Sequence, residues 1–215
     1  MIESSGDVLL EACVENLDQA LLAERKNADR IELCGRLDLG GITPPREMII
    51  SSVKQLSIPA KIMIRPRGGN FIYSDSEVEL MISDIIFCKK NGIGEIVLGA
   101  LTDKGEVDLP LIRSLSSLAD PMKVTFHKAI DDVNDYMRSL EELSTLKTIE
   151  SVLTSGTGKN AILGKPLLKN AIEIFSGTLS IIAAGSITNE NLEKVHSELG
   201  AKEYHGKRIV GDLIS

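Results

Sequence analysis

The sequence is poor in aromatic residues, and this shortage restricts how a core can be built. Phenylalanine, tyrosine and tryptophan together make up 3% of the 215 residues, and tryptophan is absent. The core must therefore consist of isoleucine, leucine, valine, alanine and methionine. Aliphatic strands of this kind are typical of parallel β-sheets that helices cover on their faces. The composition thus favours an α/β protein.

Basic clusters and long apolar runs are also missing, which argues against two classes of partner. The net charge is -7, and no basic cluster offers the contacts by which proteins bind the phosphates of nucleic acid. No segment approaches the roughly 20 apolar residues that a membrane-spanning helix needs. Met1–Gly6 is polar and acidic, unlike a targeting signal. We expect a cytoplasmic protein that binds neither nucleic acid nor membrane.

Cysteine is scarce as well, with Cys13, Cys34 and Cys88 as its three occurrences. A small, odd number of cysteines does not suit a disulfide framework and indicates reduced thiols. Cys88 lies on the apolar stripe of a segment with helical periodicity. A buried free cysteine in such a place behaves as a small hydrophobic residue, so we interpret Cys88 as a packing residue.

The chain does contain a regular alternation of short aliphatic runs and longer segments of helical periodicity. In the longer segments apolar residues recur three and four positions apart, which is typical of helices. Eight strands and seven helices are predicted. The predicted strands are Val8–Cys13, Arg30–Cys34, Lys61–Arg65, Glu95–Leu101, Lys123–Lys128, Ser151–Thr154, Leu179–Ala184 and Lys202–His205, and the predicted helix N-caps are Asn16, Thr43, Asp75, Asp108 and Thr188.

Strict alternation of strand and helix predicts a parallel sheet with right-handed crossovers, and eight strands can close it. We therefore predict a short (β/α)₈ TIM-type barrel, one domain over residues 1–215 with its barrel core at about 7–206. Only about ten residues follow the eighth strand, so the eighth helix is expected to be absent or truncated. An open doubly wound sheet would want a glycine fingerprint after the first strand, and Cys13–Asn16 is not one.

The stretch Ile62–Asn70, IMIRPRGGN, joins the third strand to a tight, positively charged loop. Pro66 biases Arg65 toward extended backbone, and the glycine pair permits a sharp turn. The guanidinium groups of Arg65 and Arg67 suit a carboxylate or phosphate because each can donate paired hydrogen bonds to an oxyanion. The alternative is that Arg65 neutralises buried glutamates while Arg67 is solvated.

Side-chain alternation along the strands predicts a polar cluster inside the barrel mouth. The inward-facing positions near strand ends are Glu11, Glu32, Arg65, His127 and His205. Active sites of such barrels lie at the C-terminal ends of the strands. Burying these groups is costly unless they are paired, so a functional reason for them is expected. A structural alternative is an ion-pair plug centred on Arg65.

Further candidate substrate-binding residues lie in loops after later strands. Asp131 follows the fifth strand, Thr154, Ser155 and Gly156 follow the sixth, and Gly185 follows the seventh. Backbone amides of glycine turns ahead of helices can bind anions. The alternative is that these glycines only form turns.

The two remaining cysteines, Cys13 and Cys34, end neighbouring strands with the same inward orientation. Strands in a sheet lie about 4.8 Å apart, which is compatible with two thiolates bridging one soft ion. Soft thiolate ligands select Cu(I) over hard cations. No CxxC motif enforces the geometry, and neutral packing of the two cysteines is an open alternative.

Together these stretches resemble the CutC copper homeostasis protein family. The matching segments are LLEACVENLDQALLAERKNADRIELC, GGITP, IMIRPRGGNFIYSD, TFHKAIDD and VLTSGT, with weaker similarity at AAGSIT and EYH. The resemblance implies a small (β/α)₈ barrel and a cytoplasmic, Cu(I)-binding homo-oligomer. It also implies that Cys13 and Cys34 are the copper-binding cysteines. The chain departs from the family at Gly206–Arg208, where charge replaces small residues, and in its short end after the eighth strand.

The alternative hypothesis is an enzyme that acts on a small anionic metabolite. The arginines of the IMIRPRGGN loop would hold the anion, Glu11 or Glu32 would act as general base, and His127 would act as acid or electrophile. In a variant of this hypothesis a divalent metal lies between Glu32, His127 and His205, whose nitrogen and oxygen atoms are acceptable ligands.

Overall fold

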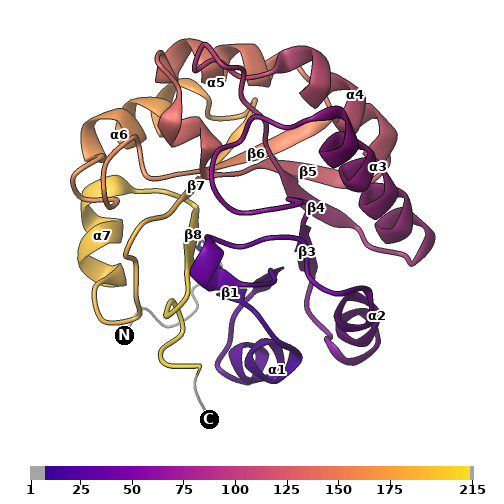
Figure 1. Ribbon diagram of the computed structural model, residues 1–215. Coiled ribbons are helices and arrows are strands. Elements are labelled where there is room, and N and C mark those ends of the chain that lie inside the picture. The colour runs from indigo at the N-terminus through magenta and orange to yellow at the C-terminus, as the bar shows by residue number, and fades with distance from the viewer. Residues whose placement is uncertain (1–7, 214–215) are drawn as a thin grey trace.

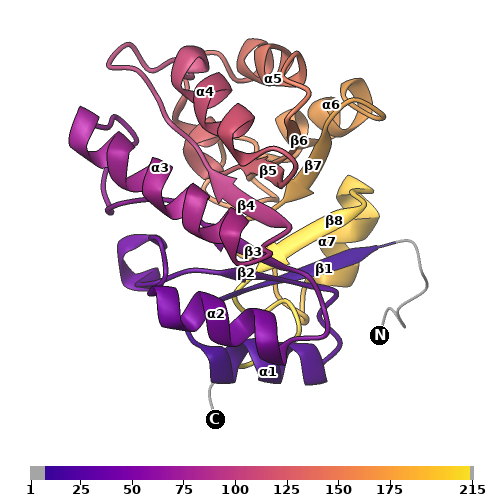
Figure 2. The same ribbon diagram turned by 90° about the vertical axis from the view of Figure 1, so that its right-hand side faces the viewer.

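A computed structural model describes residues 8–213 as a closed barrel of eight parallel strands surrounded by helices (Figure 1). The strands follow one another around the barrel in chain order, and β1 closes it by pairing with β8. Figure 2, turned by 90°, shows the helices on the outside of the strands. The (β/α)₈ prediction is confirmed. Residues 1–7 and 214–215, which the predicted domain also includes, lie outside the described residues.

The described part of the chain contains eight strands, seven α-helices and two short 3-10 helices. The strands are β1 Leu9–Val14, β2 Arg30–Leu33, β3 Ala60–Met63, β4 Glu95–Leu98, β5 Lys123–Phe126, β6 Ile149–Thr154, β7 Ser180–Ala183 and β8 Glu203–Gly206. The helices are α1 Leu17–Arg25, α2 Arg46–Gln55, α3 Asp75–Lys90, α4 Leu109–Ala119, α5 Tyr136–Ser144, α6 Lys165–Ile174 and α7 Leu192–Leu199, with the 3-10 helices η1 Leu37–Leu39 and η2 Lys128–Asp132.

The chain after β8 forms turns and no eighth helix as far as residue 213. It runs between α7 and α1, where the ring of helices is open (Figure 1). Lys26 at the end of α1 donates a hydrogen bond of 2.7 Å to the carbonyl of Asp212. The expectation of an absent or truncated eighth helix agrees with this arrangement. Across residues 8–213, no helix combines the length and apolarity that crossing a bilayer requires.

The predicted helix N-caps are partly correct. Asn16 and Asp108 accept hydrogen bonds from the first turns of α1 and α4, as expected. The predictions at Thr43, Asp75 and Thr188 are wrong, because the corresponding helices follow Pro45, Ser74 and Asn191. In α3 the Ser74 side chain and Glu77 form a reciprocal capping box that satisfies two backbone amides.

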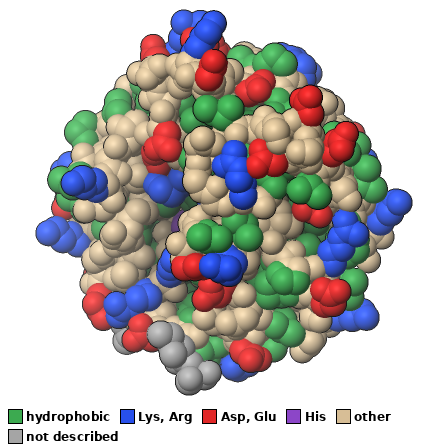
Figure 3. Space-filling model, in the orientation of Figure 1, with side chains coloured by type: hydrophobic (Ala, Val, Ile, Leu, Met, Phe, Trp, Pro, Cys, Tyr) green, Lys and Arg blue, Asp and Glu red, His purple; other side chains and the backbone are tan. Residues whose placement is uncertain are grey.

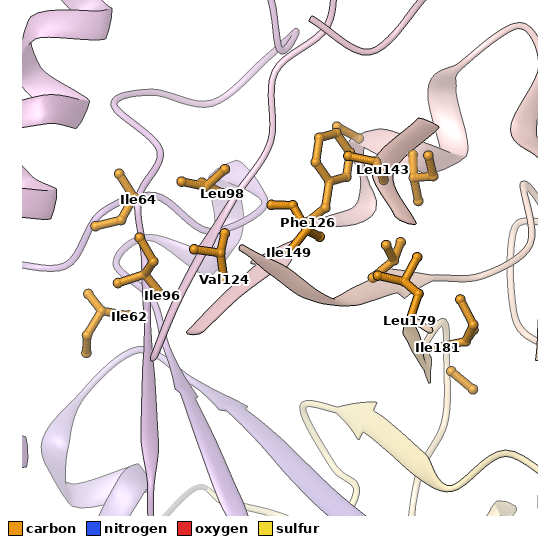
Figure 4. Packing of buried hydrophobic residues seen from close by; sticks show 14 of the residues in the cluster. Ile62, Ile64, Ile96, Leu98, Val124, Phe126, Leu143, Ile149, Leu179 and Ile181 are labelled. Atoms are coloured by element: carbon orange, nitrogen blue, oxygen red, sulfur yellow. The ribbon is translucent and has the colours of Figure 1, made fainter. Parts of the chain in front are cut away.

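The hydrophobic core lies between the strands and the surrounding helices. Figure 4 shows its aliphatic side chains on and next to the strands, including Ile62, Ile64, Ile96, Leu98 and Val124, each of which is fully buried. Burying a side chain of this size contributes about 1.5–3 kcal/mol. The alternate positions of these strands face the barrel interior, where Lys61 of β3 donates a hydrogen bond to Thr125 of the non-adjacent β5 at 2.8 Å, so the predicted alternation is correct here. The interior positions carry the polar residues from which the site is built.

Candidate functional site

A cavity of about 420 Å³ opens at the C-terminal ends of the strands. Figure 3 shows a histidine side chain within a hollow on one face of the molecule. The lining side chains that carry chemistry are Cys13, Glu32, Cys34, Arg65, His127, Lys128, His205, Lys207 and Arg208. The structure thus brings six of the predicted site side chains to one cavity. Gly185 also lines it.

One side of the cavity is formed by Cys13, Glu32, Cys34 and His205, which we call the thiol wall. Because β1 lies between β2 and β8, the ends of these three strands place the four side chains together. The Cys34 thiol donates to Glu32 Oε2 at 3.5 Å, and His205 Nε2 lies 3.7 Å from the same oxygen. Ligand atoms of Cys13, Glu32 and His205 all lie within 4.8 Å of one another. Cys13 and Cys34 belong to the same buried cluster as Met63, whose side chain carries a third sulfur atom.

Hydrogen bonding and burial divide the protons unevenly within the thiol wall. The hydrogen bond with Cys34, aided by His205, holds the pKa of the Cys13 thiol well below its usual range, although burial opposes this. The same hydrogen bond and burial raise the pKa of Cys34. Burial raises the pKa of Glu32 to about 8, against the opposing effect of His205. The site therefore favours a thiolate on Cys13, the form that binds metals.

Glu11 lies beneath the cavity and is not among the residues that line it. Its carboxylate accepts hydrogen bonds from Arg30 Nε at 2.5 Å, and Lys61 Nζ lies 3.2 Å away. Burial alone would raise the pKa of Glu11, but Lys61, His205 and Arg30 outweigh it and lower that pKa. Glu11 Oε1 also lies 2.8 Å from His205 Nδ1. Glu11 therefore reaches the cavity only through His205, and it forms a charged floor with Arg30 and Lys61.

Arg65 and His127 also line the cavity, and we call this pair, with Phe71, the arginine wall. Arg65 is 6% exposed, and its guanidinium donates to the carbonyls of Gly40, Gly41 and Gly69 at 3.2, 3.1 and 2.7 Å. Within residues 8–213, Arg65 forms no ion pair, and its Nε has no hydrogen-bond partner. The ion-pair plug centred on Arg65 is therefore wrong, since the buried ion pairs centre on Glu11 instead.

His127 is a buried neutral donor in the arginine wall. Its Nδ1 accepts a hydrogen bond from the amide of Ala129 at 3.2 Å, which leaves the proton of the neutral ring on Nε2. Nε2 has no partner in the described structure. Burial, with a smaller effect of Arg65, lowers the pKa of His127 to about 3. A β-carbon at Gly99 would lie 2.5 Å from Nδ1, so only glycine allows the ring this position.

Phe71 covers both polar groups of the arginine wall. Its ring lies 4.6 Å from Arg65 Cζ and 4.8 Å from the centre of the His127 ring. The first contact is a cation–π interaction, which partly compensates a guanidinium that lacks an anion.

Arg67 does not line the cavity. Its Nε donates to Glu77 Oε1 at 2.5 Å, and its other nitrogens donate to the carbonyls of Asn70 and Ile72 at 2.9 and 2.7 Å. These contacts hold the loop between β3 and α3. The structure therefore separates the two arginines that the sequence placed in one anion site.

The predicted substrate-binding residues after β5 and β6 form a hydrogen-bonded brace beside the cavity. Asp131 accepts from Thr154 Oγ1 at 2.6 Å and from the amides of Ser155 and Thr157 at 3.0 Å each. Lys128 also contacts Asp131. None of the four predicted residues Asp131, Thr154, Ser155 and Gly156 lines the cavity. The hydrogen bonds of Asp131 instead join the loop after β5 to the loop after β6.

Sequence reasoning missed Lys128 in the cavity and Arg30 and Lys61 beneath it. Lys128 directly follows His127, and a cation next to a predicted site residue was the signal that could have indicated it. Arg30 and Lys61 begin predicted strands and have the inward parity of Glu32 and Met63, so strand alternation could have identified both.

The fold and the cavity define a (β/α)₈ barrel with a thiol, carboxylate and imidazole cluster at the C-terminal ends of its strands. This chain belongs to the CutC family, whose sequence model matches residues 8–210. It is 45% identical over 202 residues to the copper homeostasis protein cutC homolog of Homo sapiens, covering 94% of this chain and 74% of that protein.

Two further relatives support the same assignment. The chain is 39% identical to a CutC family protein of Pasteurella multocida over 196 residues, 91% of this chain and 80% of the relative. The crystal structure of a CutC protein from Streptococcus agalactiae superimposes with a TM-score of 0.89 at 32% identity, covering 94% of this chain and 99% of that one. The resemblance found in the sequence is thereby confirmed.

Proposed function

We propose that this protein binds Cu(I) through the thiolates of Cys13 and Cys34 and serves copper homeostasis in the cytoplasm as a homo-oligomer. The observation that carries the proposal is that Cys13, Cys34 and Met63 belong to one buried cluster and that all three line the cavity. Three soft sulfur atoms in one place suit Cu(I), which prefers thiolate and thioether ligands. The relatives named for copper homeostasis support the same choice.

The donor set fits a soft monovalent ion that is carried as cargo. Cys13 already favours the thiolate, and copper binding would displace the proton of Cys34, whose pKa is raised. Cys13 is 7% exposed and Cys34 is 1% exposed, so bound copper would be shielded from water and from oxidants. His205 lies beside the thiols and balances the negative charge of a dithiolate.

A competition titration with a Cu(I) chelator of known affinity tests this proposal under strictly reducing, anaerobic conditions. We expect the Cys13→Ser, Cys34→Ser double variant to lose at least 100-fold in Cu(I) affinity. Cys88→Ser is the matched control, because Cys88 is buried in α3 away from the cavity. Equal affinities of the wild type and the double variant would overturn the proposal.

A second candidate function is an enzyme that acts on a small anionic metabolite. It is favoured by two buried N–H groups without partners in the described structure, Arg65 Nε and His127 Nε2, on one wall of a cavity. An oxyanion would pair with both, and Glu32, with a pKa of about 8, would exchange a proton near neutral pH. His127 would act as a neutral electrophilic donor.

Ligand-observed NMR with a panel of small carboxylates and phosphates tests this second candidate. We expect binding that Arg65→Met abolishes and that Arg67→Met leaves unchanged, because only Arg65 lines the cavity. Thermal unfolding checks that both variants are folded. Absence of binding by the wild type across the panel, or equal binding by both variants, would count against an enzyme of this kind.

A further inference from the structure

We infer that the thiol wall also forms a three-ligand site for a borderline divalent cation of the Zn²⁺ class, made by Cys13 Sγ, the Glu32 carboxylate and His205 Nε2. This site differs from the proposed Cu(I) site in its ligands, although it shares Cys13. It differs also from a divalent site between Glu32, His127 and His205, because Cys13 takes the place of His127.

The spacing of the ligand atoms fits a single ion. Nε2 of His205 and Oε2 of Glu32 are 3.7 Å apart, and the ligand atoms of all three residues lie within 4.8 Å of one another. Tetrahedral Zn²⁺ with bonds of about 2.0–2.3 Å separates its ligands by about 3.3–3.8 Å. Side-chain movements of about 1 Å would close the site around an ion.

The surroundings of His205 hold its ring in the orientation that a metal ligand needs. Nδ1 lies 2.8 Å from the carboxylate of Glu11, and this carboxylate is fixed by Arg30 and Lys61. Metal-binding histidines commonly donate the second ring N–H to a carboxylate, which sets the tautomer and makes the ligating nitrogen more basic. The charged floor beneath the cavity therefore leaves Nε2 to face Glu32 and Cys13.

Glu32 supplies an independent observation that points to a ligand. Its Oε1 is buried and has no hydrogen-bond partner among residues 8–213, and the residue is 2% exposed. Buried polar atoms without partners are rare because each forfeits its hydration. A cation at Glu32 would compensate this loss. The carboxylate gives no comparable advantage with Cu(I), which prefers sulfur.

The combination of one sulfur, one nitrogen and one oxygen ligand suits a borderline divalent ion. All three residues line the cavity, so the fourth coordination position would be open to it. Three protein ligands with an open fourth position are the pattern of catalytic rather than structural zinc sites. A small anion bound to the metal would then lie in the cavity that Arg65 and His127 also line.

Co²⁺ tests this inference as a spectroscopic substitute for Zn²⁺ in reduced, metal-free protein. We expect tetrahedral ligand-field bands together with a thiolate-to-cobalt charge-transfer band, both removed by added Zn²⁺. Glu32→Gln should weaken Co²⁺ binding at least tenfold and leave the Cu(I) affinity within about threefold. Cys34→Ser is the matched control and should do the reverse, because Cys34 is a proposed ligand of Cu(I) only.

Several results would overturn the inference. These are the absence of a charge-transfer band in the wild type, Co²⁺ binding that survives Glu32→Gln unchanged, or Co²⁺ binding that requires Cys34. If Glu32→Gln does not fold, zinc-edge anomalous diffraction from wild-type crystals decides, since a peak away from these three ligands, or no peak, contradicts the site. The Cu(I) titration reports separately on the proposed copper function, so the two ideas can fail independently.

Discussion

The two walls of the cavity satisfy their polar groups in different ways. In the thiol wall the side chains interact with one another, His205 also binds the charged floor through Glu11, and Glu32 Oε1 is left without a partner within residues 8–213. In the arginine wall Arg65 Nε and His127 Nε2 have no partner within residues 8–213. An unsatisfied buried donor costs about 1–3 kcal/mol. The thiol wall is therefore held mainly by contacts among its own side chains, whereas each of the two polar side chains of the arginine wall keeps a buried N–H without a partner.

Removing the carboxylate of Glu11 from the charged floor should lower the free energy of unfolding more than any other change predicted here. Glu11→Gln would leave Lys61 and one edge of Arg30 buried without their carboxylate. Breaking a buried ion pair costs about 3–5 kcal/mol, and we expect a loss of this size in the free energy of unfolding. Urea denaturation measures it. Glu150→Gln removes the exposed pair with Lys123 and is the control, with an expected effect of about 1 kcal/mol or less. Similar losses in both variants would show that the floor does not support the thiol wall.

The buried His127 of the arginine wall should make the free energy of unfolding depend on pH. His127 has a folded-state pKa of about 3 against an ordinary value of 6.5, so the unfolded chain binds the proton more readily between these values. The stability that neutral His127 contributes is therefore present above pH 6.5 and is lost as the pH falls toward 3. The slope is about 1.4 kcal/mol per pH unit.

His127→Gln removes this titration. Between pH 6.5 and 5 the wild type should lose about 1.5–2 kcal/mol more unfolding free energy than the variant. Chemical denaturation at both pH values measures the difference. Parallel pH profiles for the wild type and the variant would mean that His127 is not held neutral by its surroundings.

Arg67 sharpens the comparison because it lies in the same loop as Arg65 but outside the cavity. Arg67→Ala removes a half-exposed ion pair with Glu77 and hydrogen bonds within the loop. We expect a stability loss of about 1 kcal/mol, with the Cu(I) affinity unchanged. Thermal unfolding and the chelator titration check the two parts. A clear change in Cu(I) affinity would show that the loop contributes to the thiol wall.

The fold and much of the cavity could be predicted because both depend on strand periodicity. Alternation of strand and helix indicated the barrel, and inward parity identified Cys13, Glu32 and His205. Parity alone did not show that Glu11 lies below the cavity, because depth along the barrel depends on how neighbouring strands are staggered. In this structure Cys13, and not Glu11, is in register with Glu32.

Side chains beyond the strand ends were the least predictable. Arg67 and Asp131 lie in a loop and in η2, where backbone direction is set by local turns and hydrogen bonds. Thr43 resembled a helix cap, but its hydroxyl binds the backbone N–H of Arg65 at 2.9 Å, and α2 begins three residues later at Arg46. The contact between Thr43 and Arg65 joins segments 22 residues apart, so no local pattern indicates it.

The position of bound copper tests the contrast between the two walls most directly. Crystals grown under reducing conditions with Cu(I) can be measured at the copper absorption edge, where the anomalous signal locates the ion. We expect one peak between the sulfur atoms of Cys13 and Cys34, and none beside Arg65 or His127. A peak at the arginine wall, or no peak within the cavity, would contradict the proposed Cu(I) site.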